Sequence, residues 1–393
     1  MKRIYLDYSA TTPLKKEVLD TMMPYFSDVF GNPSSLHDFG QEAKEVLEAA
    51  RADFAACVGA TPETIYFTAG GTESDNWALR GIAAGYQSKG KHIITSAIEH
   101  HGILHVCEAL EKEGYELTYL PVDTYGKINL SELEAAIRPD TVLVSIMMVN
   151  NEIGTVQDIK AIADICHAKG TLFHSDAVQA LGNLPIDVKQ LGVDLMSFSS
   201  HKVYGPKGVG ALYARRGLRL KNFIEGGAQE KKRRAGTENV VGIVGFAAAT
   251  KLAVENLEQH RKHVSTIRDA IIEGVLAKVP YSRLNGHPTD RHPGNVHFAF
   301  EFIEGEALLL SLNAKGISGS SGSACTSGEL DPSHVLMAIG LTHEIAHGSL
   351  RLTVGDFTDA SDVPYIIDAI AEVVEKLRQW SPLYDQIKKA GRA

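Results

Sequence analysis

The sequence predicts an α/β fold in which a large domain with a mostly parallel, doubly wound sheet is joined to a smaller α+β domain. From about residue 15 to residue 255, short apolar strands alternate with helical segments. That order is typical of parallel sheets covered by helices on both faces. Beyond residue 255 the alternation gives way to a mixed pattern. The length of 393 residues is sufficient for two or three domains.

The predicted strands of the large domain are short apolar runs that end in polar or glycine-rich segments. They cover residues 64–70, 92–101, 115–123, 141–152, 171–179 and 194–202. Between them lie helical patterns at 36–57, 71–84, 131–137 and 159–168, the first with apolar residues at three- and four-residue spacing. Sheets of this kind bind ligands beyond the carboxyl ends of their strands. Several polar clusters fall at those ends.

A long helical segment, residues 240–279, connects the two predicted domains. Strand-like runs at 295–300 and 349–355 follow it, together with helix-like runs at 305–316 and 360–380. We place the boundary within the long helical segment. The large domain is then 15–256, and the small domain comprises 1–14 and 257–393.

The composition favours a cytoplasmic, soluble enzyme. A hydrophobic fraction of 44% and a charged fraction of 22% exclude a disordered or fibrous protein. The net charge of −9 argues against nucleic-acid and anionic-membrane partners. The first residues, MKRIYLDYSATTP, lack the apolar stretch of a signal peptide, and the four cysteines form no CxxC pair.

Two polar clusters at predicted strand ends have both a functional and a structural interpretation. GGTESDN, residues 70–76, opens a helix after a strand, where glycines and free amides favour a phosphate group. An ordinary helix cap explains the same residues. Asp176 ends an apolar strand and is either a functional carboxylate or a cap for the next helix.

Lys202 gives a stronger signal. It follows the apolar run LMSFSS and lies in SSHKVYGPKG, among hydroxyls, an imidazole and a Gly/Pro turn. A partly buried lysine with a lowered pKa is what an imine-forming nucleophile requires. Surface lysines are commoner in general, but they seldom follow an apolar strand in such surroundings.

Cys325 differs from the other cysteines in its surroundings. Cys57, Cys107 and Cys166 lie in apolar segments, as small buried side chains do. Cys325 lies in GSSGSACTSG, where the lack of bulky neighbours favours exposure and mobility. Those are the properties that a nucleophile in a moving loop needs.

Two further sequence patterns give little evidence about the function. HEIAH, residues 343–347, matches the zinc-protease motif, but a strand-like segment follows at once and no third ligand is evident, so we expect no metal there. Four adjacent basic residues, 231–234, are interpreted as a solvated surface turn, with phosphate binding or a subunit contact as the alternative.

Ten motifs, in order along almost the whole chain, resemble those of cysteine desulfurases of the NifS/IscS type, within the class V aminotransferase family of pyridoxal phosphate enzymes. They are YLDYSATTP (5–13), GNPSSLH (31–37), GGTESDN (70–76), EHHGIL (99–104), VNNEIGT (149–155), FHSDAVQ (173–179), SSHKVYGPKGVG (199–210), RRAGTEN (233–239), GSACTSG (322–328) and SLRLTVG (349–355).

The resemblance implies the fold of fold-type I pyridoxal phosphate transferases and a role for each matching residue. Lys202 matches the lysine that binds the cofactor and later moves protons at the substrate carbons. Asp176 matches the partner of the pyridine nitrogen, and His100 the imidazole that stacks on the ring and carries protons. The remaining matches are Gln179 for the ring hydroxyl, Gly71, Thr72, Ser199 and His201 for the phosphate, Thr237 for the phosphate of the other subunit in a homodimer, and Asn151 and Arg351 for the substrate.

The resemblance also implies a reaction. The Cys325 thiolate takes the sulfur of L-cysteine as a persulfide, L-alanine is released, and the sulfur passes to an acceptor protein. The short sequence after Cys325, TSGELDPSHVL, resembles the group that serves iron–sulfur cluster assembly.

Other functions remain open at this point. An aminotransferase would use Lys202 and Asp176 without needing Cys325, whereas a selenocysteine lyase is harder to distinguish. An inactive sulfur carrier is disfavoured because lysine, aspartate, histidine and cysteine are all present at the matching positions.

Overall fold

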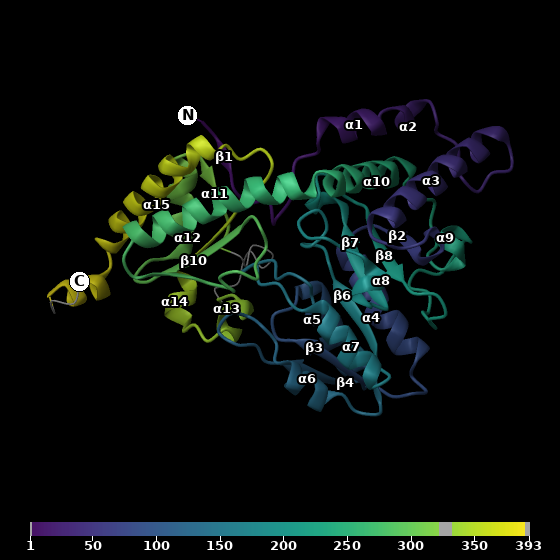
Figure 1. The fold of residues 1–393 in the computed structure, drawn as a ribbon, viewed down its shortest axis with the longest axis horizontal. Coiled ribbons are helices and arrows are strands. Elements are labelled where there is room, and N and C mark those ends of the chain that lie inside the picture. The colour runs from purple at the N-terminus through teal and green to yellow at the C-terminus, as the bar shows by residue number, and fades with distance from the viewer. Residues whose placement is uncertain (1, 322–331, 390–393) are drawn as a thin grey trace.

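The structure, a computed structural model, describes residues 2–321 and 332–389. A seven-stranded sheet forms the centre of the larger part (Figure 1). In spatial order its strands are β2 (Ile65–Thr68), β8 (Gly210–Ala214), β7 (Leu195–Ser199), β6 (Leu172–Asp176), β5 (Thr141–Ser145), β3 (His92–Ser96) and β4 (Glu116–Leu120). Only β8 runs against its neighbours within this sheet, so the prediction of a mostly parallel sheet is confirmed.

Helices cover both faces of the sheet. On one face α3 (Asp38–Cys57) and α10 (Val240–Glu255) pack with α6 (Leu130–Ala136), α7 (Ile159–Ala168) and α8 (Val188–Leu191). On the other face α4 (Gly71–Gly85) and α5 (His101–Lys112) bury Trp77 and Ile103 against the strands. The strands are apolar on both faces because both are covered. The short helices α1 (Lys16–Met22), α2 (Pro24–Ser27) and α9 (Gln229–Lys232) lie at the periphery.

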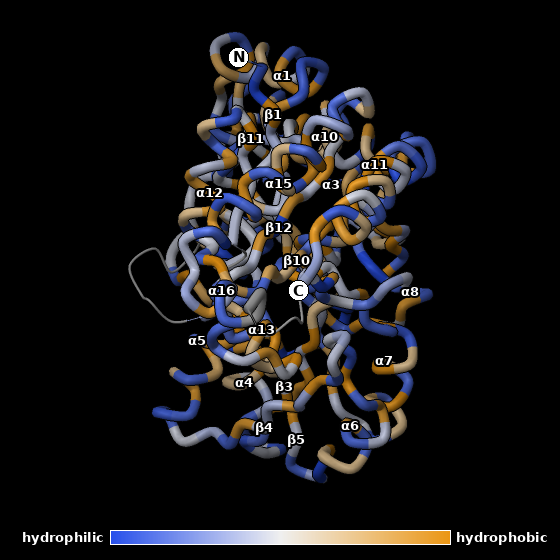
Figure 2. The backbone as a smooth tube through the Cα atoms, turned by 90° about the vertical axis from the view of Figure 1, so that its left-hand side faces the viewer, coloured by the Kyte–Doolittle hydropathy of each residue, from blue (hydrophilic) through white to orange (hydrophobic). Residues whose placement is uncertain are grey.

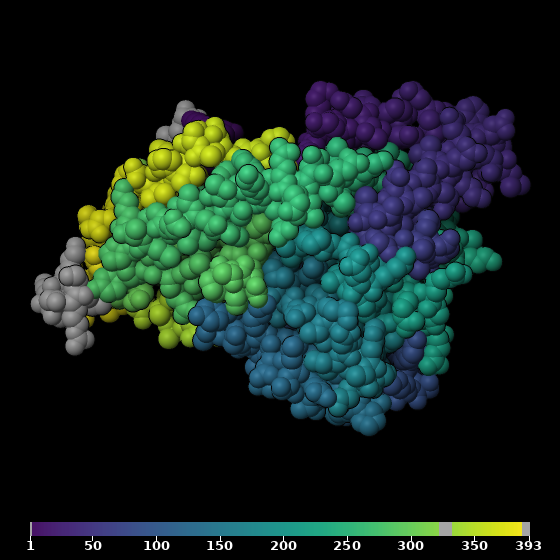
Figure 3. Space-filling model, in the orientation of Figure 1, coloured from purple at the N-terminus to yellow at the C-terminus, as the bar shows by residue number. Residues whose placement is uncertain are grey.

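The smaller part lies beside the larger part (Figure 3). It has its own sheet and its own hydrophobic core. Strands β12 (Ser349–Thr353), β10 (Asn295–Phe300) and β9 (Ser282–Leu284) form an antiparallel sheet, and β1 (Ile4–Tyr5) pairs in parallel with β11 (Ile317–Ser318). The helices are α11 (Leu257–Lys278), α12 (Gly305–Ala314), α13 (His334–Ala338), α14 (His343–His347), α15 (Val363–Arg378) and α16 (Pro382–Lys389). Hydrophobic stretches follow the strands of both parts, whereas hydrophilic ones lie at the outer turns (Figure 2).

The helical segment predicted over residues 240–279 is two helices. Asn256 separates α10 from α11 with a non-helical ψ of 11°, and the two axes meet at 73°. Packing explains the break, because α10 lies against α3 whereas α11 lies against α15. Within residues 2–321 and 332–389, no single helix is long and apolar enough to cross a membrane, although this bent pair meets the length and composition requirements when taken together.

The basic run at 231–234 is only in part the solvated turn that we predicted: Lys231 and Lys232 are exposed, but Arg233 and Arg234 are half-buried. The Lys231 ammonium donates to two backbone carbonyls beside β2, and burial lowers its pKa to about 8. Arg234 forms an ion pair with Glu73 at 2.8 Å. The turn is pulled onto the sheet because Glu230, directly before it, is buried in a 2.7 Å ion pair with Arg51.

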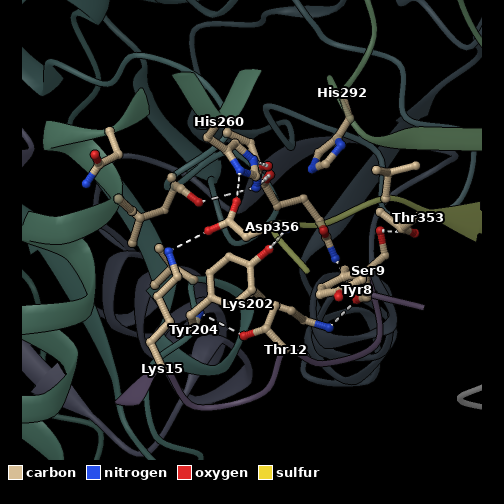
Figure 4. A pocket seen from close by; sticks show the side chains of 18 residues that line it. Tyr8, Ser9, Thr12, Lys15, Lys202, Tyr204, His260, His292, Thr353 and Asp356 are labelled. Atoms are coloured by element: carbon tan, nitrogen blue, oxygen red, sulfur yellow. Dashed lines mark hydrogen bonds and ion pairs between the residues drawn. The ribbon is translucent and has the colours of Figure 1, made fainter. Parts of the chain in front are cut away.

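Asp356 links the two parts of the chain (Figure 4). Its carboxylate accepts a hydrogen bond from Lys15 at 2.5 Å, immediately before α1, and contacts the His260 ring of α11. Its backbone N–H donates to the Tyr204 hydroxyl at 2.8 Å. Burial alone would raise the pKa of this carboxyl, but the bonds from His260 and Lys15 lower it to about 2.

We expect Asp356→Asn to lower the free energy of unfolding at pH 7 by about 2 kcal/mol. A lowered pKa means that the carboxylate stabilises the folded state above the pKa of an unfolded aspartate, about 4, and that this stabilisation is lost as the pH falls toward 2. Urea unfolding at pH 7 and pH 3 measures it: the difference between wild type and variant should shrink at pH 3. Asp53→Asn, which changes an exposed residue of α3, is the matched control and should alter the free energy of unfolding little at either pH.

Candidate active site

A cavity of about 420 Å³ opens beyond the carboxyl ends of the parallel strands. Its walls come from the ends of β6 and β7, the first turn of α4, the residue before α5, and β12. The structure brings together there ten of the twelve residues predicted for the site: Gly71, Thr72, His100, Asn151, Asp176, Gln179, Ser199, His201, Lys202 and Arg351.

Lys202 lies just after β7, at the end of a short 3₁₀ turn, Ser200–Lys202. Its ammonium donates to the backbone carbonyls of Ser9 at 2.5 Å and Ala10 at 2.7 Å. The Gln179 amide donates to the same Ser9 carbonyl at 3.0 Å. The N-terminal segment therefore forms one wall of the site and orients the lysine at the mouth of the sheet.

Two buried carboxyl groups lie under the cavity. Asp176, the last residue of β6, accepts a hydrogen bond from the Val178 N–H at 2.8 Å. Asp75 of α4 has one carboxyl oxygen with no hydrogen-bond partner within residues 2–321 and 332–389. Burial raises the pKa of both groups; the charge of Asp176 raises that of Asp75 further, whereas the charge of Lys202 lowers that of Asp176. Asp75 therefore takes up a proton first, which leaves Asp176 as the carboxylate.

His100 caps the N-terminus of α5. Its Nδ1 accepts a hydrogen bond from the Gly102 N–H at 3.0 Å, so the ring proton is on Nε2. Burial and, to a lesser extent, the charge of Lys202 lower its pKa to about 4. The imidazole is therefore neutral at pH 7, a form that packs against an aromatic ring and exchanges protons.

Backbone and hydroxyl donors gather at the N-terminus of α4. Gly71 begins this 15-residue helix, and a Cβ atom at Gly71 would lie 2.6 Å from the Val178 side chain. Thr72, Ser199 and His201 line the same cavity, and burial lowers the pKa of His201 to about 4. A helix N-terminus with hydroxyl groups beside it favours an anion such as phosphate.

Arg351 supplies the other charged group of the cavity. It lies on β12 and its side chain is only 4% exposed. One terminal nitrogen donates to the Asn151 carbonyl and the other to the Asp7 carboxylate, both at 2.9 Å. Its Nε has no partner among the residues that the structure describes. A guanidinium that lines a cavity and has unused N–H groups is suited to the carboxylate of a ligand.

The two remaining predicted residues lie elsewhere. Thr237 is exposed and does not line the cavity of its own chain. Cys325 lies outside the described residues. Burial raises the pKa of the thiols of Cys57 to about 11 and of Cys107 and Cys166 to about 12, so these three are poor thiolates.

Three residues that the structure places at the predicted site, Asp7, Ser9 and Asp75, were not predicted from the sequence. Asp7 and Ser9 belong to the motif YLDYSATTP, which carried a resemblance but no assigned role, and Asp75 belongs to GGTESDN. The motifs were the only available signal. Which side chain each residue meets depends on segments that are distant in sequence.

These residues fit the cofactor that the sequence predicts, pyridoxal 5′-phosphate. The volume is in the range of small-molecule sites. Gly71 leaves no room for a side chain beside Val178, so α4 begins directly at the cavity, where its N-terminus suits the phosphate. The Asp176 carboxylate suits a protonated ring nitrogen, and the unpaired Nε of Arg351 suits the carboxylate of an amino acid.

Comparisons with known proteins show the family of this chain. The family model described as aminotransferase class-V matches residues 4–366. A relative from Methanosarcina thermophila named cysteine desulfurase IscS is 55% identical over 382 residues, 97% of this chain and 94% of that protein. A solved structure titled NifS-like protein matches with a TM-score of 0.90 and 37% identity, covering 95% of this chain and 100% of its own.

Another solved structure, titled SspA in complex with cysteine, matches with a TM-score of 0.79 and 36% identity over 91% of this chain and 100% of its own. The family and fold predicted from the ten motifs are therefore confirmed. This chain belongs to the class-V aminotransferase family, and its cofactor is pyridoxal 5′-phosphate.

Proposed function

We propose that this chain is a cysteine desulfurase, which removes the sulfur of L-cysteine, releases L-alanine and retains the sulfur as a persulfide on Cys325. The observation that carries the proposal is the single cavity in which Lys202, Asp176 and His100 meet Arg351. The relative named cysteine desulfurase and the related structure with cysteine support this choice of substrate.

Each cofactor-binding residue has a part that follows from its position. Lys202 would bind the cofactor covalently, Asp176 would hold the proton of the ring nitrogen, and Gln179 would bond the ring hydroxyl. The phosphate would lie at the start of α4, with Gly71, Thr72, Ser199 and His201. When bound, the cofactor supplies a ring that accepts electrons from the substrate carbon.

Arg351 and Asn151 would hold the substrate carboxylate, which fixes the amino group toward Lys202. Lys202 and neutral His100 would then move protons at the substrate carbons, because both groups line the same cavity. The unprotonated Nδ1 of His100 is occupied by the Gly102 N–H, so its Nε2 is the atom that donates a proton and takes one back afterwards. The buried wall keeps bulk water from competing for these protons.

Cys325 would act as the nucleophile toward the substrate sulfur. Its thiolate forms a sulfur–sulfur bond as the carbon–sulfur bond of the substrate breaks, and the electron pair of that bond remains with carbon. Protonation of carbon gives L-alanine, and Cys325 carries the persulfide. The three other cysteines, with raised pKa values, would not compete for this task.

The same proposal includes a homodimer in which Thr237 reaches the phosphate site of the second subunit. The exposure of Thr237 supports it, as do exposed apolar side chains on the first three helices and the turn between them: Leu19, Met23, Phe26, Phe30, Leu36 and Phe39. Sedimentation equilibrium of the cofactor-loaded protein tests this part; a monomer would contradict it.

We further propose that the persulfide passes to an iron–sulfur scaffold or another sulfur-acceptor protein, and that the enzyme acts in the cytoplasm. We also retain the division into a large domain, 15–256, and a small domain, 1–14 with 257–393. Two separate hydrophobic cores and the bend at Asn256 support that division.

The proposed function is tested by incubating the cofactor-loaded protein with L-cysteine and a thiol, and measuring L-alanine and sulfide. We expect both products in equal amounts. Transfer of the amino group to a 2-oxo acid in place of alanine release would indicate an aminotransferase. Activity confined to L-selenocysteine would indicate a selenocysteine lyase.

A further inference from the structure

We propose that Asp7 positions the Arg351 guanidinium for the carboxylate of the amino-acid substrate, and that Asp7 thereby gives the site its preference for amines that carry a carboxylate. This inference rests on the proposed function and extends it to a residue that does not line the cavity. Asp7 is a positioning residue, since it acts on the substrate through Arg351.

The surroundings of the guanidinium support this role. Asp7 accepts from one terminal nitrogen of Arg351 and the Asn151 carbonyl from the other, both at 2.9 Å. Nε is buried without a partner among residues 2–321 and 332–389, and each terminal nitrogen has a second N–H beside the one that these bonds use. Arg351 lines the cavity, whereas Asp7 does not. Asp7 therefore holds the guanidinium from behind, and a substrate carboxylate does not need to displace it.

The backbone of Asp7 is itself fixed. The Tyr5 hydroxyl and the Ala10 N–H both donate to the Asp7 carbonyl at 2.9 Å. Asp7 also forms a parallel β-bridge with Thr353, two residues beyond Arg351 on β12. The backbone of Asp7 is therefore attached to β12, the strand that carries Arg351. The Asp7 carboxylate and the Arg351 guanidinium thus keep their positions relative to each other.

The same segment contacts the catalytic lysine. Two and three residues after Asp7, the carbonyls of Ser9 and Ala10 accept hydrogen bonds from the Lys202 ammonium. Residues 7–10 therefore connect the group that would hold the substrate carboxylate to the group that would receive its amine. Because these two anchors are held by one short segment, they keep their positions relative to each other, as a ligand with an amine and a carboxylate on the same carbon requires.

The test compares two ligands that differ in the carboxylate alone, L-alanine and ethylamine. Their binding to the cofactor-loaded protein is followed by the absorbance of the cofactor, and neither contains sulfur to be removed. We expect Asp7→Ala to weaken L-alanine binding about ten-fold, the effect of losing a hydrogen bond to a charged group, and to leave ethylamine binding within about two-fold. KM for L-cysteine should rise by a similar factor, with kcat nearly unchanged.

Asp7→Asn keeps an oxygen acceptor for Arg351 and should restore L-alanine binding to the wild-type level or tighter. Asp20→Ala removes an exposed aspartate of α1 and serves as the matched control. Unchanged L-alanine binding in Asp7→Ala, or equal weakening of both ligands, would overturn the proposal. If the wild type fails to release alanine from L-cysteine, the proposed function fails, whereas the comparison of L-alanine with ethylamine still decides the role of Asp7.

Discussion

Lys202→Ala is expected to abolish turnover of L-cysteine, with a decrease in kcat of about 10³-fold or more. The lysine has two expected tasks, covalent binding of the cofactor and proton transfer at the substrate carbons, and no other lysine lines the described cavity. The substitution also leaves the carbonyls of Ser9 and Ala10 without their charged donor.

Borohydride treatment separates these tasks from a folding defect. It should fix the cofactor on the wild-type chain at the peptide that contains Lys202, as seen by mass spectrometry, and should fix none on the variant. Lys207→Ala is the matched control, since Lys207 lies five residues later on the exposed side of the same turn. A Lys202→Ala protein that still retains reduced cofactor would show that another lysine binds it.

Cys325→Ala is expected to bind L-cysteine with near-normal affinity and to release alanine at least about 10²-fold more slowly. The other described thiols do not substitute for it, because burial raises the pKa of Cys57 to about 11 and of Cys107 to about 12. Mass spectrometry after one turnover should find an added sulfur on wild-type Cys325 and none elsewhere.

Cys57→Ala, which removes a partly exposed cysteine, should leave both alanine release and the persulfide unchanged. If Cys325→Ala forms alanine at the wild-type rate, the thiol is not the nucleophile. The selenocysteine lyase interpretation, in which the leaving group needs no thiol, then becomes the better one.

The sequence alone predicts the central strands, because runs such as TVLVS at β5 are rich in β-branched and apolar residues. It does not reveal β8, whose residues GALYA include no β-branched side chain, although this strand joins β2 to the rest of the sheet. The break at Asn256 is likewise invisible locally, since each flanking helix follows a different core.

The cavity-lining residues of the candidate site were predictable because short motifs carry them at strand ends, where parallel sheets place their ligands. The ion pair of Asp7 with Arg351 was not predictable, since these residues are 344 positions apart. The burial of Asp75 was not predictable either, because its motif, GGTESDN, is equally typical of an exposed first helical turn. Side-chain partners of this kind follow from tertiary packing.

The pairing of β1 with β11 has a consequence for biosynthesis. Ile4 is made long before its strand partner Ile317, because about 310 residues separate them in the chain. The seven-stranded sheet can form earlier, since all its strands precede residue 215. The segment that holds Lys202 and Arg351 must therefore wait until β11 has been made. A nascent chain can thus acquire its central sheet well before it has a complete catalytic centre, which delays the reactive chemistry until the small part of the protein has been synthesised.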